Sequence, residues 1–363
     1  MYQILVVLIS FSIIPILIRK KVRLSFTLLV TAGLLSVFSG IGISKVVSAF
    51  SSVFLEPAPR ATLLTVLMVS ILGGLMGKYG LLGRIVKILG KTVKNKKNTL
   101  ILIPALAGFL PIPGGALLSA PFVNNIGEEL ELSPERRTVI NLVFRHIAMF
   151  VMPYSTGLLI IASSFPDLNI IKIILLNTVF IGLIIGTGYF LYIKDIKVEL
   201  LVERKDLARN LLKILVLLSP IYVPVVVSLT TGLPFYITLI FSIAIVYALG
   251  SKEDFITNII KSISWNTILT VAIILIIKEI ILGMDSLLLV FESMLAFSQN
   301  SFYILLIFLI TSLFFGLITG NQAAPLAVVL PMIYQLNVET NLPYIFLAFG
   351  SAFIGYYFSP LHL

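Results

Sequence analysis

Apolar residues follow one another in long runs through most of this chain, and polar residues gather in the short segments between the runs. Several runs reach the length of about 17–25 residues that an α-helix needs to cross a hydrocarbon core of roughly 30 Å. The runs lack the apolar–polar alternation of a membrane β-barrel, so the pattern predicts an all-α polytopic membrane protein. The predicted spans are 2–18, 24–44, 58–78, 138–165, 168–193, 211–231, 233–249, 265–284 and 342–363.

Composition narrows the class of protein further. Of the 363 residues, 59% are hydrophobic and 12% are charged, which is too much apolar surface for a soluble domain. There is no cysteine, so a disulfide framework and a thiolate metal site are both excluded. The first apolar run has no basic segment before it and no small-residue cleavage site after it, so we expect it to be a span and not a secretory signal. We expect no cofactor and no metal site, apart from a coupling ion.

The basic residues predict how the chain is oriented. The net charge is +10, but the Lys and Arg residues lie beside the spans, where they set topology, so we expect no nucleic-acid partner. The segment "RKKVR" at 19–23 places the first loop in the cytoplasm and the N-terminus outside. We therefore expect a multi-pass protein of the cell membrane whose basic loops lie in the cytoplasm and whose spans contact the lipid bilayer.

Two further apolar regions, 98–127 and 302–336, contain helix-breaking residues; the first includes "GFLPIPGGALLSAP" (108–121). If 98–127 crossed the membrane, the basic segment 194–213 would lie outside. If it enters and leaves on the cytoplasmic side, most of the 26 Lys and Arg residues lie inside. We therefore predict a re-entrant helical hairpin, because non-helical backbone at membrane depth is tolerated only inside protein or beside a water-filled cavity.

The two halves of the chain are similar to each other. The matching segments, in the same order and at a nearly constant offset, are "ATLLTVLMVSILGG" (61–74) with "NTILTVAIILIIKE" (266–279), the first hairpin tip with "GLITGNQAAPLAVVLP" (316–331), and "FVMPYS" (150–155) with "YYFSPLH" (356–362). The predicted orientation makes the two halves run in opposite directions through the membrane. They would form an inverted repeat, which is typical of secondary transporters.

The repeat also predicts the domain organisation. Each half carries one hairpin and one helix broken at a proline, and we expect the two hairpin tips to meet near the middle of the membrane. The second half ends without a counterpart to the last span of the first, so we expect one or more spans to be missing. The predicted parts are a first repeat at 1–193 (hairpin 98–127, helix 138–165 broken at Pro153), a cytoplasmic linker at 194–210, and a second repeat at 211–363 (hairpin 302–336, truncated helix 342–363 broken at Pro360).

These motifs resemble those of a known family. The Pro-Gly hairpin tip, "FRHIAMFVMPYS" (144–155) and "GYYFSPLHL" (355–363) resemble an uncharacterised prokaryotic membrane family of the ion transporter superfamily, related to the gluconate permeases and distantly to the divalent-anion/sodium symporters. The resemblance covers most of the chain and implies an elevator-type transporter of organic anions, coupled to sodium or protons and often dimeric. The Ser-Asn-Thr signatures of sodium/dicarboxylate relatives are absent from both tips, which argues against sodium coupling through these signatures. The coupling ion stays open between H⁺ and Na⁺.

Two pairs of adjacent charged or titratable residues within predicted spans are candidates for function. Arg145 and His146 are deep, where a charge costs at least ~2.5–3.5 kcal/mol and marks function by default. Arg145 is a candidate for binding a substrate carboxylate, and His146 for taking up a coupled proton. Alternatively, Arg145 pairs with a backbone carbonyl or reaches the inner interface. Lys278 and Glu279 are candidates for ion coupling, and the alternative is a helix end with Lys278 at the outer interface.

The hairpin tips and helix breaks supply the other candidate residues. Hydroxyl and amide side chains at the tips donate and accept hydrogen bonds, and glycines let the backbone approach a ligand, unless those glycines only make the turn. The predicted substrate-binding residues are Pro113, Gly114, Gly115, Arg145, Tyr154, Ser155, Thr319, Gly320, Asn321 and Gln322. The predicted ion-coupling residues are His146, Lys278 and Glu279, and the predicted helix breaks are Pro153 and Pro360.

These features favour a secondary active transporter, either a symporter or an antiporter, for a small organic anion such as a carboxylate or a sugar acid. The chain has no "GxxxxGK[ST]" segment and no soluble domain, which argues against an ATP-driven pump. A membrane-embedded enzyme is disfavoured because the two His residues are far apart and no paired acids lie deep in the spans. A truncated, non-transporting remnant and a channel or structural subunit stay open as alternatives.

Overall fold

The chain is helical throughout the part that the structure describes. The computed structural model describes residues 2–93, 95–109, 115–197, 207–250, 252–287, 289, 293, 301–335 and 342–361. No β-strand occurs within these ranges, which confirms the all-α prediction. The helices are α1 (Tyr2–Arg19), α2 (Leu24–Phe38), α3 (Ile43–Leu55), α4 (Pro57–Lys78), α5 (Leu81–Thr92), α6 (Lys96–Gly108), α7 (Gly115–Glu129), α8 (Pro134–Arg145), α9 (Ile147–Val151), α10 (Thr156–Ser164), α11 (Ile170–Leu176), α12 (Thr178–Tyr192), α13 (Leu207–Thr231), α14 (Phe235–Leu249), α15 (Phe255–Lys261), α16 (Trp265–Leu282), α18 (Ser301–Thr319), α19 (Ala323–Gln335) and α20 (Leu342–Tyr357).

Seven helical segments in the described ranges are long and apolar enough to cross a membrane, which agrees with the predicted polytopic membrane protein. They are Tyr2–Arg19, Pro57–Lys78, Pro134–Ser164, Ile170–Tyr192, Leu207–Thr231, Trp265–Leu282 and Phe302–Thr319. The last of these is the first arm of the predicted hairpin 302–336, so this arm, unlike those of the first hairpin, is long enough to cross the membrane. The spans predicted at 24–44, 233–249 and 342–363 contain shorter apolar helices of 15, 15 and 16 residues. At 1.5 Å per residue these helices are roughly 22–24 Å long, which is shorter than a typical hydrocarbon core.

The chain turns within the region that the sequence predicts as the single span 24–44. Gly40 and Gly42 have φ angles of +72° and +85°, a conformation that glycine adopts without steric cost. Helix α2 therefore ends at Phe38, and the separate helix α3 begins at Ile43. Only the end of this predicted span, 39–44, is wrong, because apolar composition alone does not report a backbone turn at two glycines.

The basic segment after α4, predicted as a loop, forms the helix α5. Its residues Leu81, Ile85 and Leu89 are buried, whereas Arg84 and Lys87 are exposed. The buried residues recur every four positions, which places them on one face of a helix. The prediction missed this helix because it used only the charges of the segment, which indicate topology. The four-residue spacing of its apolar residues is the signal that indicates a helix.

The described chain divides into two compact units. Unit 1 consists of Met1–Leu64, Thr156–Leu176 and Trp265–Leu363, and unit 2 consists of Thr65–Ser155 and Asn177–Ser264. Each unit draws segments from both halves of the sequence. These units are therefore a different division of the chain from the two predicted repeats, which follow one another in sequence.

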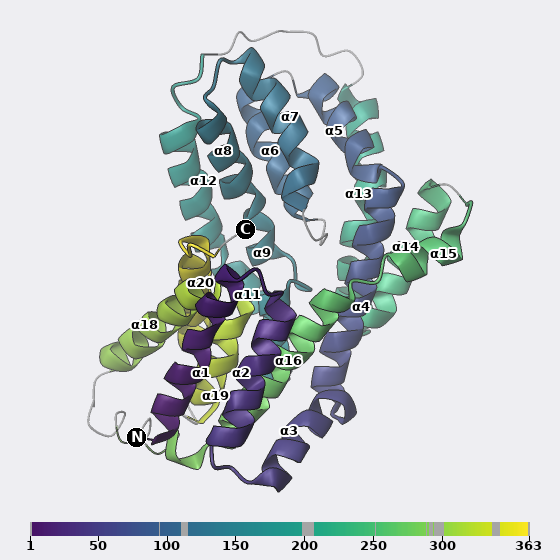
Figure 1. Cartoon of the computed structure of the whole chain (residues 1–363). Helices are drawn as coiled ribbons and strands as arrows, with labels where there is room; N and C mark the ends of the chain where they lie inside the picture. Colours follow the sequence, from purple (N-terminus) through teal and green to yellow (C-terminus); the bar gives the residue numbers. More distant parts are fainter. Residues whose placement is uncertain are drawn as a thin grey trace. The chain divides into compact units, whose positions relative to one another are not determined.

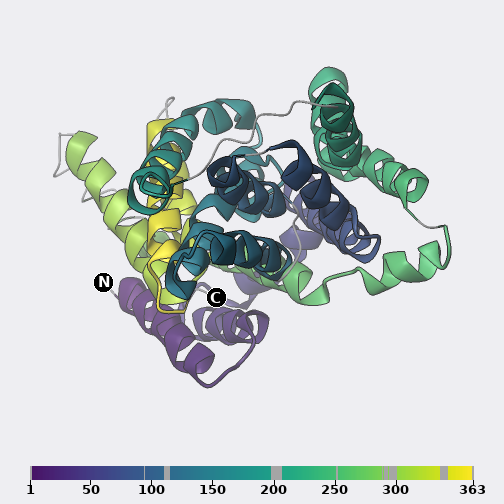
Figure 2. The same cartoon turned by 90° about the horizontal axis from the view of Figure 1, so that it is seen from above.

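Helix α16 forms the centre of unit 1. Nearly all of its residues from Thr270 to Ile281 are buried, and it packs against α2, α3 and α19. A helix that protein surrounds on all sides needs no polar face, which explains the continuous apolar run in its sequence. Around it, α18 packs along α20 (Figure 1), and α1 and α2, coloured purple, lie side by side (Figure 2).

Helices α6 and α7 form a hairpin in unit 2. They pack on each other and both pack on α8 (Figure 1). An ion pair of 2.8 Å between Lys96 Nζ and Glu129 Oε2 joins the first residue of α6 to the last residue of α7. The chain therefore enters and leaves the hairpin at the same end. Nearby, hydrogen bonds from Arg137 and Asn124 hold the pKa of the Glu128 carboxyl below its usual range. The arms have 13 and 15 residues, which corresponds to roughly 20 and 22 Å.

Helices are interrupted at both predicted prolines. Helix α9 ends at Val151, and the chain around Pro153 is not helical until α10 begins. Helix α20 ends at Tyr357, and Pro360 lies in a turn. Proline has no N–H group and its ring clashes with the preceding turn, so neither helix continues through it.

Candidate functional site

A helix–turn–helix element in unit 1 carries four of the predicted site residues. Thr319 ends α18, and residues 320–322 form the turn before α19. Gly320 has a φ of +58°, and a Cβ atom there would lie 2.8 Å from the Cβ of Leu361. Both the backbone conformation and the close approach of Leu361 require glycine at this position.

Thr319 and Asn321 form hydrogen bonds within the turn itself. Asn321 Oδ1 accepts from the N–H groups of Ala323 and Ala324 at 2.8 and 3.2 Å, which caps α19. Thr319 Oγ1 donates to the Asn321 carbonyl at 3.1 Å and accepts from the Asn321 N–H at 3.3 Å. These two side chains shape the turn, and a ligand would have to compete with bonds that they already make.

Gln322 differs from its neighbours because its side chain is buried without any hydrogen bond. The residue is 4% exposed, and neither Nε2 nor Oε1 has a partner among the described residues. Leaving a buried polar group unpaired costs about 1–3 kcal/mol. An amide in this state is the kind of group that a bound ligand would satisfy.

The first turn of α10 lies beside this amide. A Cβ atom on Gly157, the second residue of α10, would lie 3.4 Å from Gln322 Oε1 and 2.8 Å from Phe349 Cε2. Glycine at this position therefore lets both side chains approach the start of the helix. The first N–H groups of a helix have no partner within it and carry the positive end of its dipole. Gln322 and the start of α10 together offer N–H donors to an anion.

The segment around Pro360 lies against the same turn. Ser359 Oγ donates to the Leu317 carbonyl at 2.6 Å and accepts from the Leu361 N–H at 3.1 Å. Leu361 in turn contacts Gly320. The structure thus brings together the α18–α19 turn, the break at Pro360 and the start of α10 within one unit.

Lys278 and Glu279 form an ion pair in the buried helix α16. Their Nζ and Oε1 atoms are 2.7 Å apart, and their side chains are 5% and 18% exposed. Adjacent residues on a helix project about 100° apart, but these long side chains bend toward each other and cancel each other's charge. Removing either partner would leave an uncompensated buried charge, which is strongly destabilising.

Arg145 and His146 lie in unit 2, at the junction of α8 and α9. His146 is 5% exposed, and its Nδ1 donates to the Leu142 carbonyl at 2.5 Å. Because a carbonyl only accepts, this bond requires the ring to carry a proton on Nδ1. The carbonyl of Arg145 lies so close to Gly108 of α6 that a Cβ atom on Gly108 would overlap it.

Tyr154 and Ser155 brace the break after Pro153. The hydroxyl of Tyr154, which is 3% exposed, donates to the Ile221 carbonyl at 3.2 Å. Ser155 Oγ donates to the Met149 carbonyl at 3.1 Å. Both hydroxyls thus tie the non-helical segment to neighbouring backbone of unit 2.

Part of the predicted site lies outside the described residues. This applies to Pro113 and Gly114, and therefore to the tip of the first hairpin, whereas Gly115 is the first residue of α7. The expected meeting of the two tips stays a prediction. The other candidates fall into two sets: the α18–α19 turn, Pro360 and the Lys278–Glu279 pair are in unit 1, and the residues from Arg145 to Ser155 are in unit 2.

The sequence reasoning missed three buried polar residues of unit 2. Ser119 of α7 donates to Asn141 of α8 at 2.6 Å, and these residues are 0% and 7% exposed. Asn177 is fully buried, and its Nδ2 donates to the Phe150 carbonyl at 3.1 Å. The two asparagines stand alone in the apolar segments "VINLVF" and "LLNTVF". A single amide within an apolar run is a usable signal, because burying it is costly unless it finds a partner.

Comparison with known proteins places the chain in a family. No curated protein matches the sequence. Residues 2–363 match a family model with the description "Protein of unknown function (DUF401)". This description names no activity. Because the match extends over nearly the whole chain, the protein belongs to the DUF401 family.

Proposed function

We propose that this protein is a secondary active transporter that carries a small organic anion, such as a carboxylate or a sugar acid, across the cell membrane. The observation that carries the proposal is the Gln322 amide, which is buried at the α18–α19 turn without a partner among the described residues. Seven helical segments able to cross a membrane are the expected setting for such a carrier.

The chemistry of this site suits an anion. Gln322 Nε2 has two N–H donors, and the start of α10 adds backbone N–H groups with a positive dipole. Carboxylate oxygens accept such hydrogen bonds, and Gln322 Oε1 can accept from a hydroxyl group of the same substrate. Binding through dipoles rather than through a full positive charge keeps the affinity moderate, which suits a carrier that has to release its substrate.

The paired hairpins and helix breaks support a carrier with alternating access. Inverted repeats with interrupted helices are typical of secondary transporters. The arms of the α6–α7 hairpin are too short to cross a bilayer, and its two ends are held together by the Lys96–Glu129 ion pair. We therefore keep the re-entrant hairpins, the inverted repeat, the elevator mechanism and the relation to the ion transporter superfamily as parts of the proposal.

Two buried groups are our candidates for ion coupling. His146 can take up a proton at Nε2 while Nδ1 stays bonded to the Leu142 carbonyl. In the Lys278–Glu279 pair, a proton on Glu279 would release Lys278 from its partner. Both groups favour H⁺ as the coupling ion, with Na⁺ as the alternative to be tested.

The topology of the first hairpin can be tested with single cysteines, because the native chain has none. We expect cysteines at Lys96 in α6 and Asn125 in α7 to react with a membrane-impermeant thiol reagent from the cytoplasmic side only, since both arms start from one end. Lys45 follows the second predicted span, so it is expected outside if the first loop is cytoplasmic. A cysteine at Lys45 is therefore the matched control and should react only from the opposite side. Labelling of Lys96 and Asn125 from opposite faces would contradict the re-entrant hairpin.

Transport itself can be tested with the purified protein in proteoliposomes. We expect saturable uptake of at least one member of a panel of carboxylates and sugar acids, and stimulation of this uptake by an inward proton gradient. Neutral amide or alcohol analogues of the same acids are the matched control, since they lack the charge that the N–H donors recognise. A panel without saturable uptake under either a proton or a sodium gradient would contradict the proposal and favour a structural membrane subunit.

A further inference from the structure

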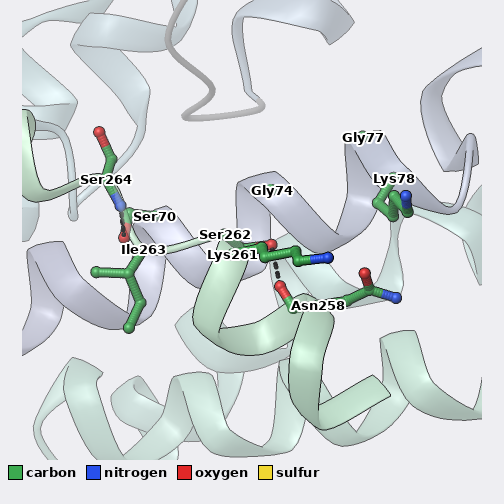
Figure 3. A pocket seen from close by; sticks show the side chains of 9 residues that line it. All are labelled: Ser70, Gly74, Gly77, Lys78, Asn258, Lys261, Ser262, Ile263 and Ser264. Atoms are coloured by element: carbon green, nitrogen blue, oxygen red, sulfur yellow. Dashed lines mark hydrogen bonds between the residues drawn. The ribbon is translucent and has the colours of Figure 1, made fainter. Parts of the chain in front are cut away.

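Unit 2 contains a polar pocket that the proposed transport site does not use. Its volume is about 480 Å³, which is in the range of small-ligand sites. The C-terminal part of α4 forms one wall, and α15 with the segment that follows it forms the other (Figure 3). The lining residues are Ser70, Gly74, Gly77, Lys78, Asn258, Lys261, Ser262, Ile263 and Ser264.

The two walls are held together without the two lysines. Ser264 N–H donates to Ser70 Oγ at 3.3 Å, which joins the two walls, whereas Ser262 Oγ donates to the Asn258 carbonyl at 2.7 Å within the α15 wall. A Cβ atom on Gly74 would lie 2.5 Å from the Cβ of Ser262, so the walls touch at this glycine. The pocket is therefore built by backbone and hydroxyl contacts, and its amines are left for another role.

Lys78 and Lys261 supply the charge of the pocket. Both are exposed, neither has an ion pair with an acidic group in the described part of the chain, and no Asp or Glu is among the lining residues. Figure 3 shows that Lys78 from α4 and Lys261 and Asn258 from α15 have their polar ends on the same side of the pocket. Two amines from two different elements thus converge without a counter-charge from the protein.

Helix dipoles do not cancel this charge. Lys78 and Lys261 are the last residues of α4 and α15, where the helix ends carry the equivalent of roughly −0.5 charge each. The two ammonium groups outweigh this negative charge by about one full charge, and their side chains extend away from the helix ends. The net field in the pocket is positive, so its ligand is an anion.

The pocket lies at the end of a helix that is long and apolar enough to span a membrane, which is where a spanning helix meets the membrane surface. Helix α4 is one of the segments able to span a membrane, so Lys78 marks one of its ends. Helix α15 exposes Ile256 and Ile260 at 74% and 63%, one helical turn apart on the same face. Exposed apolar residues beside lysines are typical of a helix that lies in the interface between lipid and water.

We infer that this pocket binds a phosphate group, as carried by the headgroup of an anionic phospholipid or by a soluble phosphate monoester. Two ammonium groups provide six N–H donors for the several oxygens of a phosphate. The position at the membrane surface favours the lipid, because anionic headgroups are concentrated where Lys78 and Lys261 lie. The inference is independent of the proposed transport site, since Gln322 and α10 belong to unit 1.

The test is equilibrium binding to the full-length protein in detergent, measured by native mass spectrometry. The probes are dioctanoyl phosphatidylglycerol, dioctanoyl phosphatidylcholine and glycerol 3-phosphate. The pocket variant is Lys78→Gln/Lys261→Gln, and Lys78→Arg/Lys261→Arg retains the charge. The matched control is Lys87→Gln/Lys213→Gln, which removes two exposed lysines of the same unit outside the pocket.

We expect the pocket variant to bind phosphatidylglycerol at least about tenfold more weakly than the control, which corresponds to the loss of charge-assisted hydrogen bonds. The arginine variant should retain most of the affinity, and phosphatidylcholine should bind more weakly than phosphatidylglycerol to the unmodified protein. Binding of glycerol 3-phosphate as tight as that of the lipid, with the same sensitivity to the two lysines, would assign the pocket to a soluble phosphate. Equal affinities for the pocket variant and the control would overturn the inference.

Discussion

Replacement of Gln322 by leucine is expected to weaken substrate binding and transport strongly without destabilising the protein. Leucine is close to glutamine in volume and removes an amide that has no partner among the described residues. The variant should therefore match the wild type in stability or exceed it by up to about 1–3 kcal/mol, the cost of the unpaired amide. Substrate affinity should fall roughly tenfold to a hundredfold, because the ligand loses its bonds to the amide. The measurements are the apparent unfolding temperature in detergent and uptake in proteoliposomes.

A second buried glutamine of unit 1 provides the matched control. Gln3 is 9% exposed, and both ends of its amide are bonded: Nε2 donates to the Ser39 carbonyl at 2.8 Å, and Oε1 accepts from the Leu287 N–H at 3.0 Å. Gln3→Leu should therefore lower the unfolding temperature, since it removes the amide bonded to the Ser39 carbonyl, at a cost of about 1–3 kcal/mol. It also removes one of the two acceptors of the Leu287 N–H, which is bonded to the Met284 carbonyl as well. A loss of stability in Gln322→Leu as large as that in Gln3→Leu would show that Gln322 has a structural partner and no ligand role.

Gly108→Ala is expected to destabilise unit 2 strongly. A Cβ atom at this position would overlap the carbonyl oxygen of Arg145 and lie 3.1 Å from the Cβ of Ala148. A backbone carbonyl cannot rotate away as a side chain does, so α6 and α8 would have to separate. Overpacking of this kind costs about 1–3 kcal/mol or more. The unfolding temperature of the purified variant, or its failure to accumulate in the membrane, measures the effect.

Helix α12 supplies the control for this glycine. Gly182 and Gly186 have no atom within 4 Å of the position that a Cβ would take. Alanine at either position should leave the stability unchanged or raise it by up to about 1 kcal/mol, because alanine is the better helix former. If Gly108→Ala behaves like these two variants, the close approach of α6 to α8 at Arg145 does not exist in the membrane.

Some features of the site depend only on neighbouring residues in the sequence, and others depend on tertiary packing. The capping of α19 by Asn321 and the turn at Gly320 are local, and proline favours the helix breaks at Pro153 and Pro360. Proline alone does not decide them, because α1, α6, α7, α13 and α19 continue through prolines of their own. These features can be read from short segments of sequence. The pairing of Lys278 with Glu279 could not be read in this way, because adjacent residues on a helix usually point in different directions and only burial in α16 makes the pair favourable.

The sequence by itself determined that the chain is a helical membrane protein and where most of its helices begin and break. These properties depend on the length of apolar runs, on proline and on short-range hydrogen bonds, all of which are local. Only the tertiary structure decided which buried glutamine is satisfied. Gln3 finds the backbone of Leu287, which is 284 residues away, whereas Gln322 finds no partner in the described part of the chain. The hydrogen-bond partner of a buried amide is the backbone group that tertiary packing places beside it. Its neighbours in sequence therefore do not predict whether the amide is bonded.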